Sequence, residues 1–153
     1  MGAPFRGCGT KVGGPFTAPQ HVLIDRLQLE GQIEHLGLVT LPELVAAYGR
    51  ADVLLMPSWY EGFGLPVLEA MACGVPVVAA NRASLPEVVG DAGLLIEPDD
   101  LDGVADAVTR IIADPALRED LRQRGLKRAS EFTWERSAQL TLAVYHAVKE
   151  ASS

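Results

Sequence analysis

Two glutamates, Glu61 and Glu69, flank a glycine-rich turn in residues 57–69, PSWYEGFGLPVLE. Ionised carboxylates accept hydrogen bonds, and the hydroxyl groups of a sugar or a ribose are suitable donors. Between the two glutamates, Gly62 and Gly64 have no Cβ, so a ligand can approach the main chain closely. These residue types in this order indicate a cradle for a ligand that carries several hydroxyl groups.

The residues around the turn predict a strand, a loop and a helix. Residues 53–56, VLLM, form a short apolar run of the kind found in buried strands. Pro66 suits a first helical position, and Gly74 can end the helix. Glu61 would then lie in the loop and Glu69 about one turn inside the helix. The two carboxylates can therefore face one crevice from different heights.

A helix that begins here also offers a site for an anion. The first N–H groups of a helix have no intrahelical partner and carry the positive end of the helix dipole. We expect the amides near Gly64, Leu65 and Val67 to hold phosphate oxygens, whereas Pro66 has no N–H to donate. A sugar joined to a nucleoside through a diphosphate would satisfy both the carboxylates and the amides.

Each feature also has a simpler explanation, because a glutamate in a first helical turn is favourable by itself and glycine-rich connections are common in α/β folds. The wider sequence favours the ligand hypothesis. Residues 58–79 resemble the donor-binding half of glycosyltransferase family 4, a retaining family with the GT-B fold. The resemblance continues through residues 84–95, SLPEVVGDAGLL, and more loosely from Leu36 to Tyr145.

The resemblance implies transfer of a sugar from a nucleoside diphosphate to an acceptor, with retention at the anomeric carbon and without an obligatory metal or cofactor. It implies that Glu61 is the catalytic residue and bonds hydroxyls of the donor sugar, and that Glu69 holds the ribose. The strand end near Val39 would lie along the base. The implied donor-binding residues are Ser58, Gly62, Phe63, Gly64, Leu65, Val67, Glu69 and Val39.

Strand and helix patterns alternate over most of the chain, which predicts an α/β, Rossmann-like domain with a parallel sheet of about four strands and helices on both faces. Helical patterns alone follow Leu101, with a break at Asp114–Pro115 and an N-cap at Thr133. We expect the last helix to pack on its own sheet. Residues 1–18 are expected to be irregular and residues 19–150 to form one nucleotide-sugar-binding domain. The predicted strands are 33–36, 53–56, 75–79 and 93–96, and the earlier helices 20–30, 42–48, 66–73 and 85–89.

The chain has room for only one of the two Rossmann-like domains of a GT-B enzyme, so we expect an N-terminally truncated half-domain that needs a separate acceptor domain. Residues 10–12 resemble what remains of the family's second strand. Arg6 and Lys11 have the spacing of the family's diphosphate-binding pair, but the strand and helix that should accompany them do not fit. The absent first strand would leave unpaired edges, which favour a homodimer.

The composition limits the function further. The 153 residues carry a formal net charge of −7, which argues against nucleic acid as a partner. They are 48% hydrophobic, which favours a compact domain. No apolar run is long enough to span a membrane, and Cys8 and Cys73 are too few for a disulfide framework. We expect a cytoplasmic protein with Cys73 on the buried side of a helix. The three histidines are widely spaced and predict no metal site.

Two other functions remain open. Paired carboxylates also serve glycosidases, but a helix N-terminus favours ionised carboxylates over the raised pKa that a general acid needs. Alternatively, the chain is a non-catalytic Rossmann-like binding or oligomerisation module. Trp59 and Tyr60, next to the motif, either line the crevice or pack against the following helix.

Overall fold

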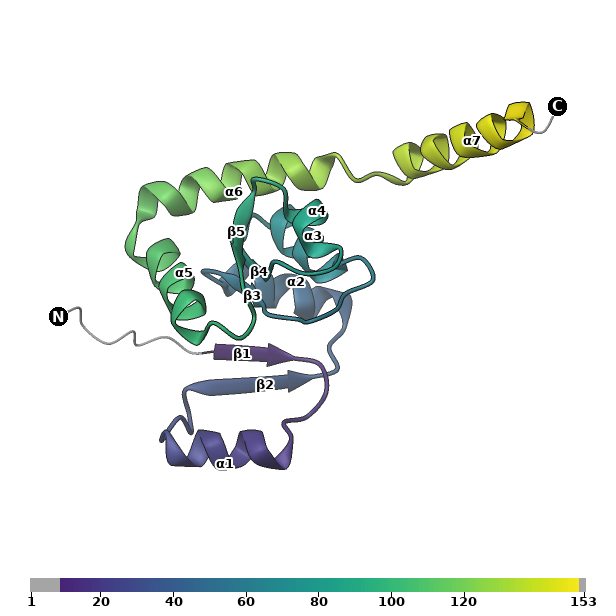
Figure 1. Ribbon diagram of the computed structural model, residues 1–153. Helices are drawn as coiled ribbons and strands as arrows, with labels where there is room; N and C mark the ends of the chain where they lie inside the picture. Colours follow the sequence, from purple (N-terminus) through teal and green to yellow (C-terminus); the bar gives the residue numbers. More distant parts are fainter. Residues whose placement is uncertain (1–8, 152–153) are drawn as a thin grey trace. The chain divides into compact units, whose positions relative to one another are not determined.

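The computed structural model describes residues 9–151, and their contacts divide into two compact units with a boundary between Ala47 and Tyr48. The first unit contains β1 (Gly9–Val12), α1 (Ala18–Arg26) and β2 (Ile33–Gly37). The helix α2 (Leu41–Arg50) crosses the boundary. The second unit contains the remaining strands and helices (Figure 1). The domain bounds of 19–150 stay a prediction.

In the first unit, β1 and β2 pair in parallel, with Gly9 opposite Ile33. Residues 1–18 are therefore not irregular throughout, because β1 forms where a strand remnant was predicted. The helix α1 begins after Thr17, whose N–H donates to Oε1 of Gln20 at 2.9 Å. It ends at Arg26 rather than near residue 30, because Gln28 has a φ of 54°, which a helix does not allow.

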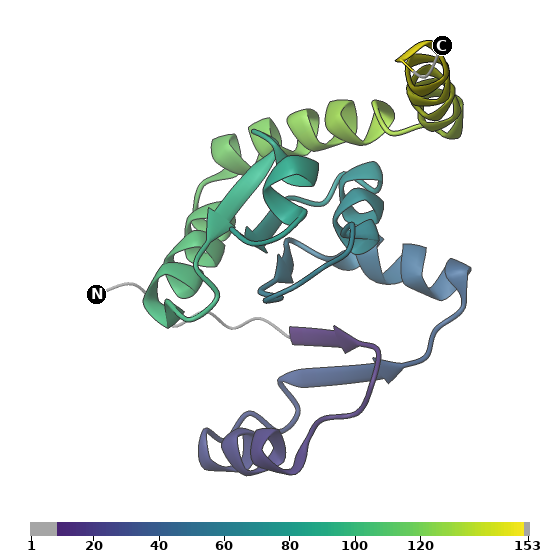
Figure 2. The ribbon, with the colours of Figure 1, turned by 45° about the vertical axis from the view of Figure 1, so that its right-hand side comes forward.

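The second unit is built on a parallel sheet with the strand order β3-β4-β5 (Leu54–Met56, Val77–Ala80 and Gly93–Ile96). The helices α3 (Leu65–Ala72) and α4 (Leu85–Val89) lie on one side of this sheet and α5 (Leu101–Ala113) on the other, as Figures 1 and 2 show. Every residue of β4 is buried, as expected for a central parallel strand. The α/β prediction is confirmed, and α4 and β5 have the predicted bounds.

The strands form two sheets instead of one sheet of about four strands. In the Rossmann order 3-2-1-4-5-6, one strand stands between those that correspond here to β1 and β3. No strand among residues 9–151 pairs with the second edge of either β1 or β3.

Helix α6 (Pro115–Ser130) holds the second unit together. Its N-cap is Asp114, whose carboxylate accepts from the N–H of Ala116 at 2.9 Å, so the predicted break at this residue is confirmed. Near its other end, Arg128 donates to the carbonyls of Glu87 at 2.6 Å and Val88 at 3.1 Å. These are carbonyls of the last turn of α4, which otherwise lack an intrahelical donor. The guanidinium therefore fixes the C-terminal end of α4 to α6.

The last helix, α7 (Trp134–Ala151), differs from expectation. Its predicted cap is confirmed, since the Thr133 hydroxyl accepts from the N–H of Arg136 at 3.1 Å. All of its residues are exposed, however, so α7 does not pack on its own sheet. The sheet is already covered by the preceding helices, which leaves an apolar row of α7 in contact with solvent: Leu140, Val144, Tyr145 and Val148. No helix within 9–151 combines the length and the apolar character needed to cross a membrane.

Cys73 also differs from expectation, because it is exposed rather than on a buried face. The helix α3 ends at Ala72, and Cys73 is its C-cap, where the chain turns towards Gly74 with a φ of 74°. The buried face of α3 is formed instead by Val67, Ala70 and Met71. Cys8 lies outside the described residues.

Gly64 tests the backbone turn that leads into α3. We expect Gly64→Ala to lower the free energy of unfolding by about 2 kcal/mol, because an alanine at positive φ is strained and its Cβ would overlap a buried neighbour. Gly64 has a φ of 99°, and a Cβ there would lie 2.8 Å from Cδ2 of Leu85. Urea unfolding measures the change.

Gly62→Ala is the matched control in the same loop. Nothing lies within 4 Å of a Cβ at Gly62, and its φ is not positive. We expect this variant to unfold like the wild type. Equal stability of the two variants would contradict the role given to Gly64.

Candidate functional site

The motif forms the predicted strand, loop and helix, in which β3 leads through a loop of residues 58–64 (the motif loop) into α3. Gly64 is the N-cap of α3, in the left-handed conformation, and Pro66 lies in the first helical turn. The side chain of Val67 is fully buried, which fixes α3 against the core. The sharp left-handed turn at Gly64 brings the chain from the sheet into a helix within a few residues.

The turn leaves a run of main-chain N–H groups free of partners. Within residues 9–151, the amides from Gly62 to Leu65 donate no hydrogen bond. Gly62, Phe63 and Leu65 are exposed, whereas Gly64 is buried beneath Leu85. The Val67 amide differs from the prediction, because it donates to the carbonyl of Gly64 at 3.0 Å. The free donors are therefore the expected amides of Gly64 and Leu65 together with those of Gly62 and Phe63, and the Val67 amide is not among them.

Glu61 is half-buried, and its carboxylate has no hydrogen bond or ion pair with the residues that the structure describes. Its main chain, by contrast, is fixed, because the carbonyl of Glu61 accepts from the hydroxyl of Ser84 at 2.9 Å. A free carboxylate on a fixed main chain is suited to accept hydrogen bonds from a ligand.

Glu69 lies in α3, and its side chain is held by a residue that the sequence analysis missed. The Tyr48 hydroxyl donates to Oε2 of Glu69 at 3.2 Å and lies 3.3 Å from the carbonyl of Pro66. Burial, and then the charge of the Glu69 carboxylate, raise the pKa of Tyr48 well above its usual range, so the hydroxyl keeps its proton. The available signal was a tyrosine on the apolar side of a helix, whose buried hydroxyl needs a partner.

Ser84 was also missed as a site residue. Its hydroxyl donates to the carbonyls of Glu61 at 2.9 Å and Phe63 at 3.0 Å, both in the motif loop. A serine directly before a helix usually caps that helix, and Ser84 stands directly before α4. It makes no such bond here, because its hydroxyl is turned towards the motif loop. The sequence alone favours the cap.

The other predicted residues have different surroundings. Ser58 is half-buried, and Val39 belongs to the first unit, where it is half-buried as well. Trp59 and Tyr60 are exposed rather than packed on α3, and the guanidinium of Arg82 lies 5.8 Å from the centre of the Trp59 ring. That Ser58 and Val39 bind the donor stays a prediction.

Of the two basic residues Arg6 and Lys11, the structure describes only Lys11. The ammonium group of Lys11 donates to the carbonyl of Gly14 and lies 5.1 Å from the centre of the Phe16 ring. Arg6 lies outside the described residues. The side chain of Lys11 is therefore engaged within its own unit.

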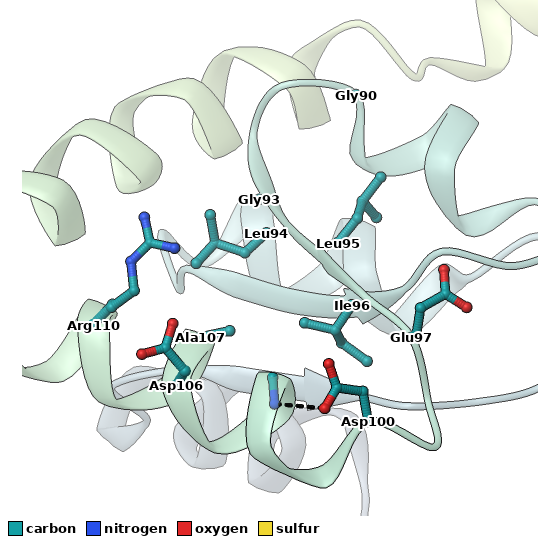
Figure 3. A pocket seen from close by; sticks show the side chains of 11 residues that line it. Gly90, Gly93, Leu94, Leu95, Ile96, Glu97, Asp100, Asp106, Ala107 and Arg110 are labelled. Atoms are coloured by element: carbon teal, nitrogen blue, oxygen red, sulfur yellow. Dashed lines mark hydrogen bonds between the residues drawn. The ribbon is translucent and has the colours of Figure 1, made fainter.

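A separate hollow of about 510 Å³ lies between β5 and α5 (Figure 3). No residue of the motif lines it. Acidic and basic side chains, among them Asp106 and Arg110, are mixed on its wall, and Asp100 accepts from the N–H of Gly103 at 3.0 Å as the cap of α5. In the part of the chain that the structure describes, no group of histidine, cysteine and acidic residues could hold a metal ion.

Comparison with known proteins gives a consistent result. The family model described as "Glycosyl transferases group 1" matches residues 8–128. The chain is 46% identical over 123 residues to the O-antigen chain mannosyltransferase B of Escherichia coli. This match covers 80% of the chain but only 32% of the relative. The chain thus spans about a third of the length of this curated relative.

Solved structures agree with the sequence match. Sucrose-phosphate synthase from Thermosynechococcus elongatus is 31% identical with a TM-score of 0.77, over 93% of this chain and 38% of that one. HepE from Anabaena, in complex with UDP-glucose, is 25% identical with a TM-score of 0.77, over 92% and 41% of the two chains. The fold and the sequence therefore lead to one conclusion: the chain belongs to the group 1 glycosyltransferases.

Proposed function

We propose that the chain is the donor-binding part of a retaining glycosyltransferase of family 4, which transfers a sugar from a nucleoside diphosphate sugar to an acceptor. The observation that carries this proposal is the run of unpartnered N–H groups from Gly62 to Leu65, with Glu61 before it and Glu69 after it. It stands in the motif by which the chain resembles its family.

The parts of the donor match the parts of the motif. The free amides and the positive end of α3 bind the diphosphate oxygens. Glu69, whose carboxylate is oriented by Tyr48, accepts hydrogen bonds from the ribose hydroxyls. Glu61 accepts from hydroxyls of the donor sugar. Ser58 also contacts the donor in this proposal. The Val67 amide does not, because it already donates to the carbonyl of Gly64.

In the reaction, the bond from the anomeric carbon to the diphosphate oxygen breaks and a bond from that carbon to the acceptor hydroxyl oxygen forms. The hydroxyl proton passes to the leaving diphosphate. The charge that develops on the leaving diphosphate is the charge that the amides and the helix dipole stabilise. We assign no metal to this step. An acceptor-binding domain completes the site, and the whole reaction takes place in the cytoplasm.

The likeness to HepE with UDP-glucose and to a mannosyltransferase supports a nucleotide-sugar donor but leaves several candidates for the base and the sugar. The probes are UDP-glucose, GDP-mannose and ADP-glucose, each with its nucleoside diphosphate alone. The comparison of each sugar nucleotide with its diphosphate separates contacts to the sugar from contacts to the nucleotide.

A second candidate function is a non-catalytic binding or oligomerisation module, and the fully exposed helix α7 favours it. The apolar row of α7, together with the second edge of β3, offers surfaces on which a second copy can pack. We accordingly propose a homodimer for the isolated chain.

The two glutamates provide the main test of donor binding. We expect Glu69→Ala to abolish calorimetric binding of both a sugar nucleotide and its diphosphate, because it removes the acceptor for the ribose. Glu61→Gln should lower the affinity for the sugar nucleotide by about tenfold, because it removes one charged hydrogen-bond acceptor, and should leave the affinity for the diphosphate unchanged.

The matched control is Glu30→Gln, an exposed glutamate without a hydrogen bond or ion pair in the described chain. It should bind like the wild type. Failure of the wild type to bind any probe at millimolar concentration would exclude donor binding and support the module.

Tyr48→Phe tests how Glu69 is held. We expect the affinity of the variant for a sugar nucleotide and for its diphosphate to fall by the same factor, about fivefold. The reason is the loss of one hydrogen bond to the ribose-binding carboxylate. Titration calorimetry measures both affinities. A loss confined to the sugar nucleotide would show that Tyr48 and Glu69 do not serve the ribose.

The oligomeric state tests the proposed homodimer. We expect light scattering over a series of concentrations to give the dimer mass, and Leu140→Glu with Val144→Glu in α7 to shift it to the monomer mass. Leu142→Glu is the control, because Leu142 is exposed but lies outside the defined row of α7. A monomer at every concentration for the wild type contradicts the dimer.

A further inference from the structure

The hydroxyl of Ser84 joins two points of the motif loop. Its Oγ lies 2.9 Å from the carbonyl oxygen of Glu61 and 3.0 Å from that of Phe63. These carbonyls stand on either side of Gly62, the residue at which the free N–H groups begin. Since a serine hydroxyl has one proton, the two carbonyls share a single donor. One side chain therefore fixes the middle of the loop.

The neighbouring residue makes a second contact with the same loop. Leu85 is fully buried, and a Cβ at Gly64 would lie 2.8 Å from its Cδ2 atom. Leu85 thus packs on the main chain of Gly64, at the entry to α3. Ser84 and Leu85 together contact both the middle and the end of the motif loop.

The helix that carries these two residues is itself fixed. The guanidinium of Arg128 in α6 donates to the carbonyls of Glu87 and Val88, at the other end of α4. The segment SLPEVV in residues 84–89 therefore connects the motif loop at one end with α6 at the other. The position of the loop depends on the position of α4.

The backbone before Ser84 is strained. Ala83 has a φ of 50°, a left-handed conformation that is unfavourable for a residue other than glycine. The strained turn directly precedes a serine whose hydroxyl does not cap its own helix. Such strain persists when the surrounding contacts over-determine it, and it is concentrated at functional sites. Here the strained turn accompanies the two bonds to the motif loop.

We propose that Ser84 is a positioning residue. Through its bonds to the carbonyls of Glu61 and Phe63, it holds the motif loop in the position in which the loop binds the sugar of the donor. This inference rests on the proposed function of the motif. Ser84 acts through the loop and does not touch the ligand. The ribose contact is held separately, by Tyr48 on Glu69 in α3. Loss of the Ser84 hydroxyl therefore affects recognition of the sugar and leaves recognition of the nucleotide intact.

The test uses the full chain with Ser84→Ala and Ser84→Thr, and it has two readouts. We expect the backbone ¹⁵N order parameters of Gly62, Phe63 and Gly64 to fall in Ser84→Ala, without a ligand, because the loop loses the bonds that fix it. We also expect Ser84→Ala to weaken binding of UDP-glucose, GDP-mannose or ADP-glucose, whichever the wild type binds, by about fivefold, the effect of one lost hydrogen bond. Binding of the matching nucleoside diphosphate should not change.

Two variants complete the design. Ser84→Thr keeps a hydroxyl and should restore most of the lost affinity. Ser130→Ala removes a hydroxyl that also donates to a main-chain carbonyl, that of Lys127 at 2.6 Å, and should leave both readouts unchanged. The pair separates loss of this particular hydroxyl from loss of any serine.

Each outcome decides between the hypotheses. Unchanged order parameters in the motif loop of Ser84→Ala overturn the positioning role, and so does an equal loss of affinity for the sugar nucleotide and the diphosphate. Wild-type affinity of Ser84→Ala for the sugar nucleotide overturns the positioning role alone. Failure of the wild type to bind any of the three sugar nucleotides overturns the proposed function, and the role of Ser84 with it.

Discussion

The left-handed turn at Gly64 is the constraint on which the rest of the site depends. Because Gly64 has no Cβ, Leu85 packs against its main chain, and the chain turns from the motif loop into α3 in one residue. The turn leaves the N–H groups from Gly62 to Leu65 without partners, while Val67 anchors the helix in the core. Backbone geometry alone thus provides the free donors that we propose for the diphosphate.

The contacts around this turn join α4 to the motif loop. Tyr48 orients the carboxylate of Glu69, and Ser84 fixes the carbonyls of the motif loop, so α3 and the loop are held by different neighbours. Arg128 fixes α4 from the far side. The two carboxylates can therefore be perturbed separately, which allows contacts to the sugar and to the nucleotide to be distinguished experimentally.

Much of the fold could be predicted from the sequence, because the buried strands are short apolar runs and the breaks at Asp114 and Thr133 carry clear cap residues. The errors have physical reasons. The end of α1 depends on a positive φ at Gln28, which a glutamine in the sequence does not predict. Cys73 is exposed because α3 stops one residue earlier, and α7 finds no free sheet face. Ser84 and Tyr48 were missed because tertiary partners, rather than local patterns, determine where a hydroxyl donates.

The most direct test of the central claim is a titration followed by the backbone amide signals of the ¹⁵N-labelled chain. On addition of the sugar nucleotide, the account predicts that the largest changes occur at Gly62, Phe63, Gly64 and Leu65, the amides without partners in the described chain. Changes centred instead on the hollow between β5 and α5, at Leu94 and Arg110, would contradict it.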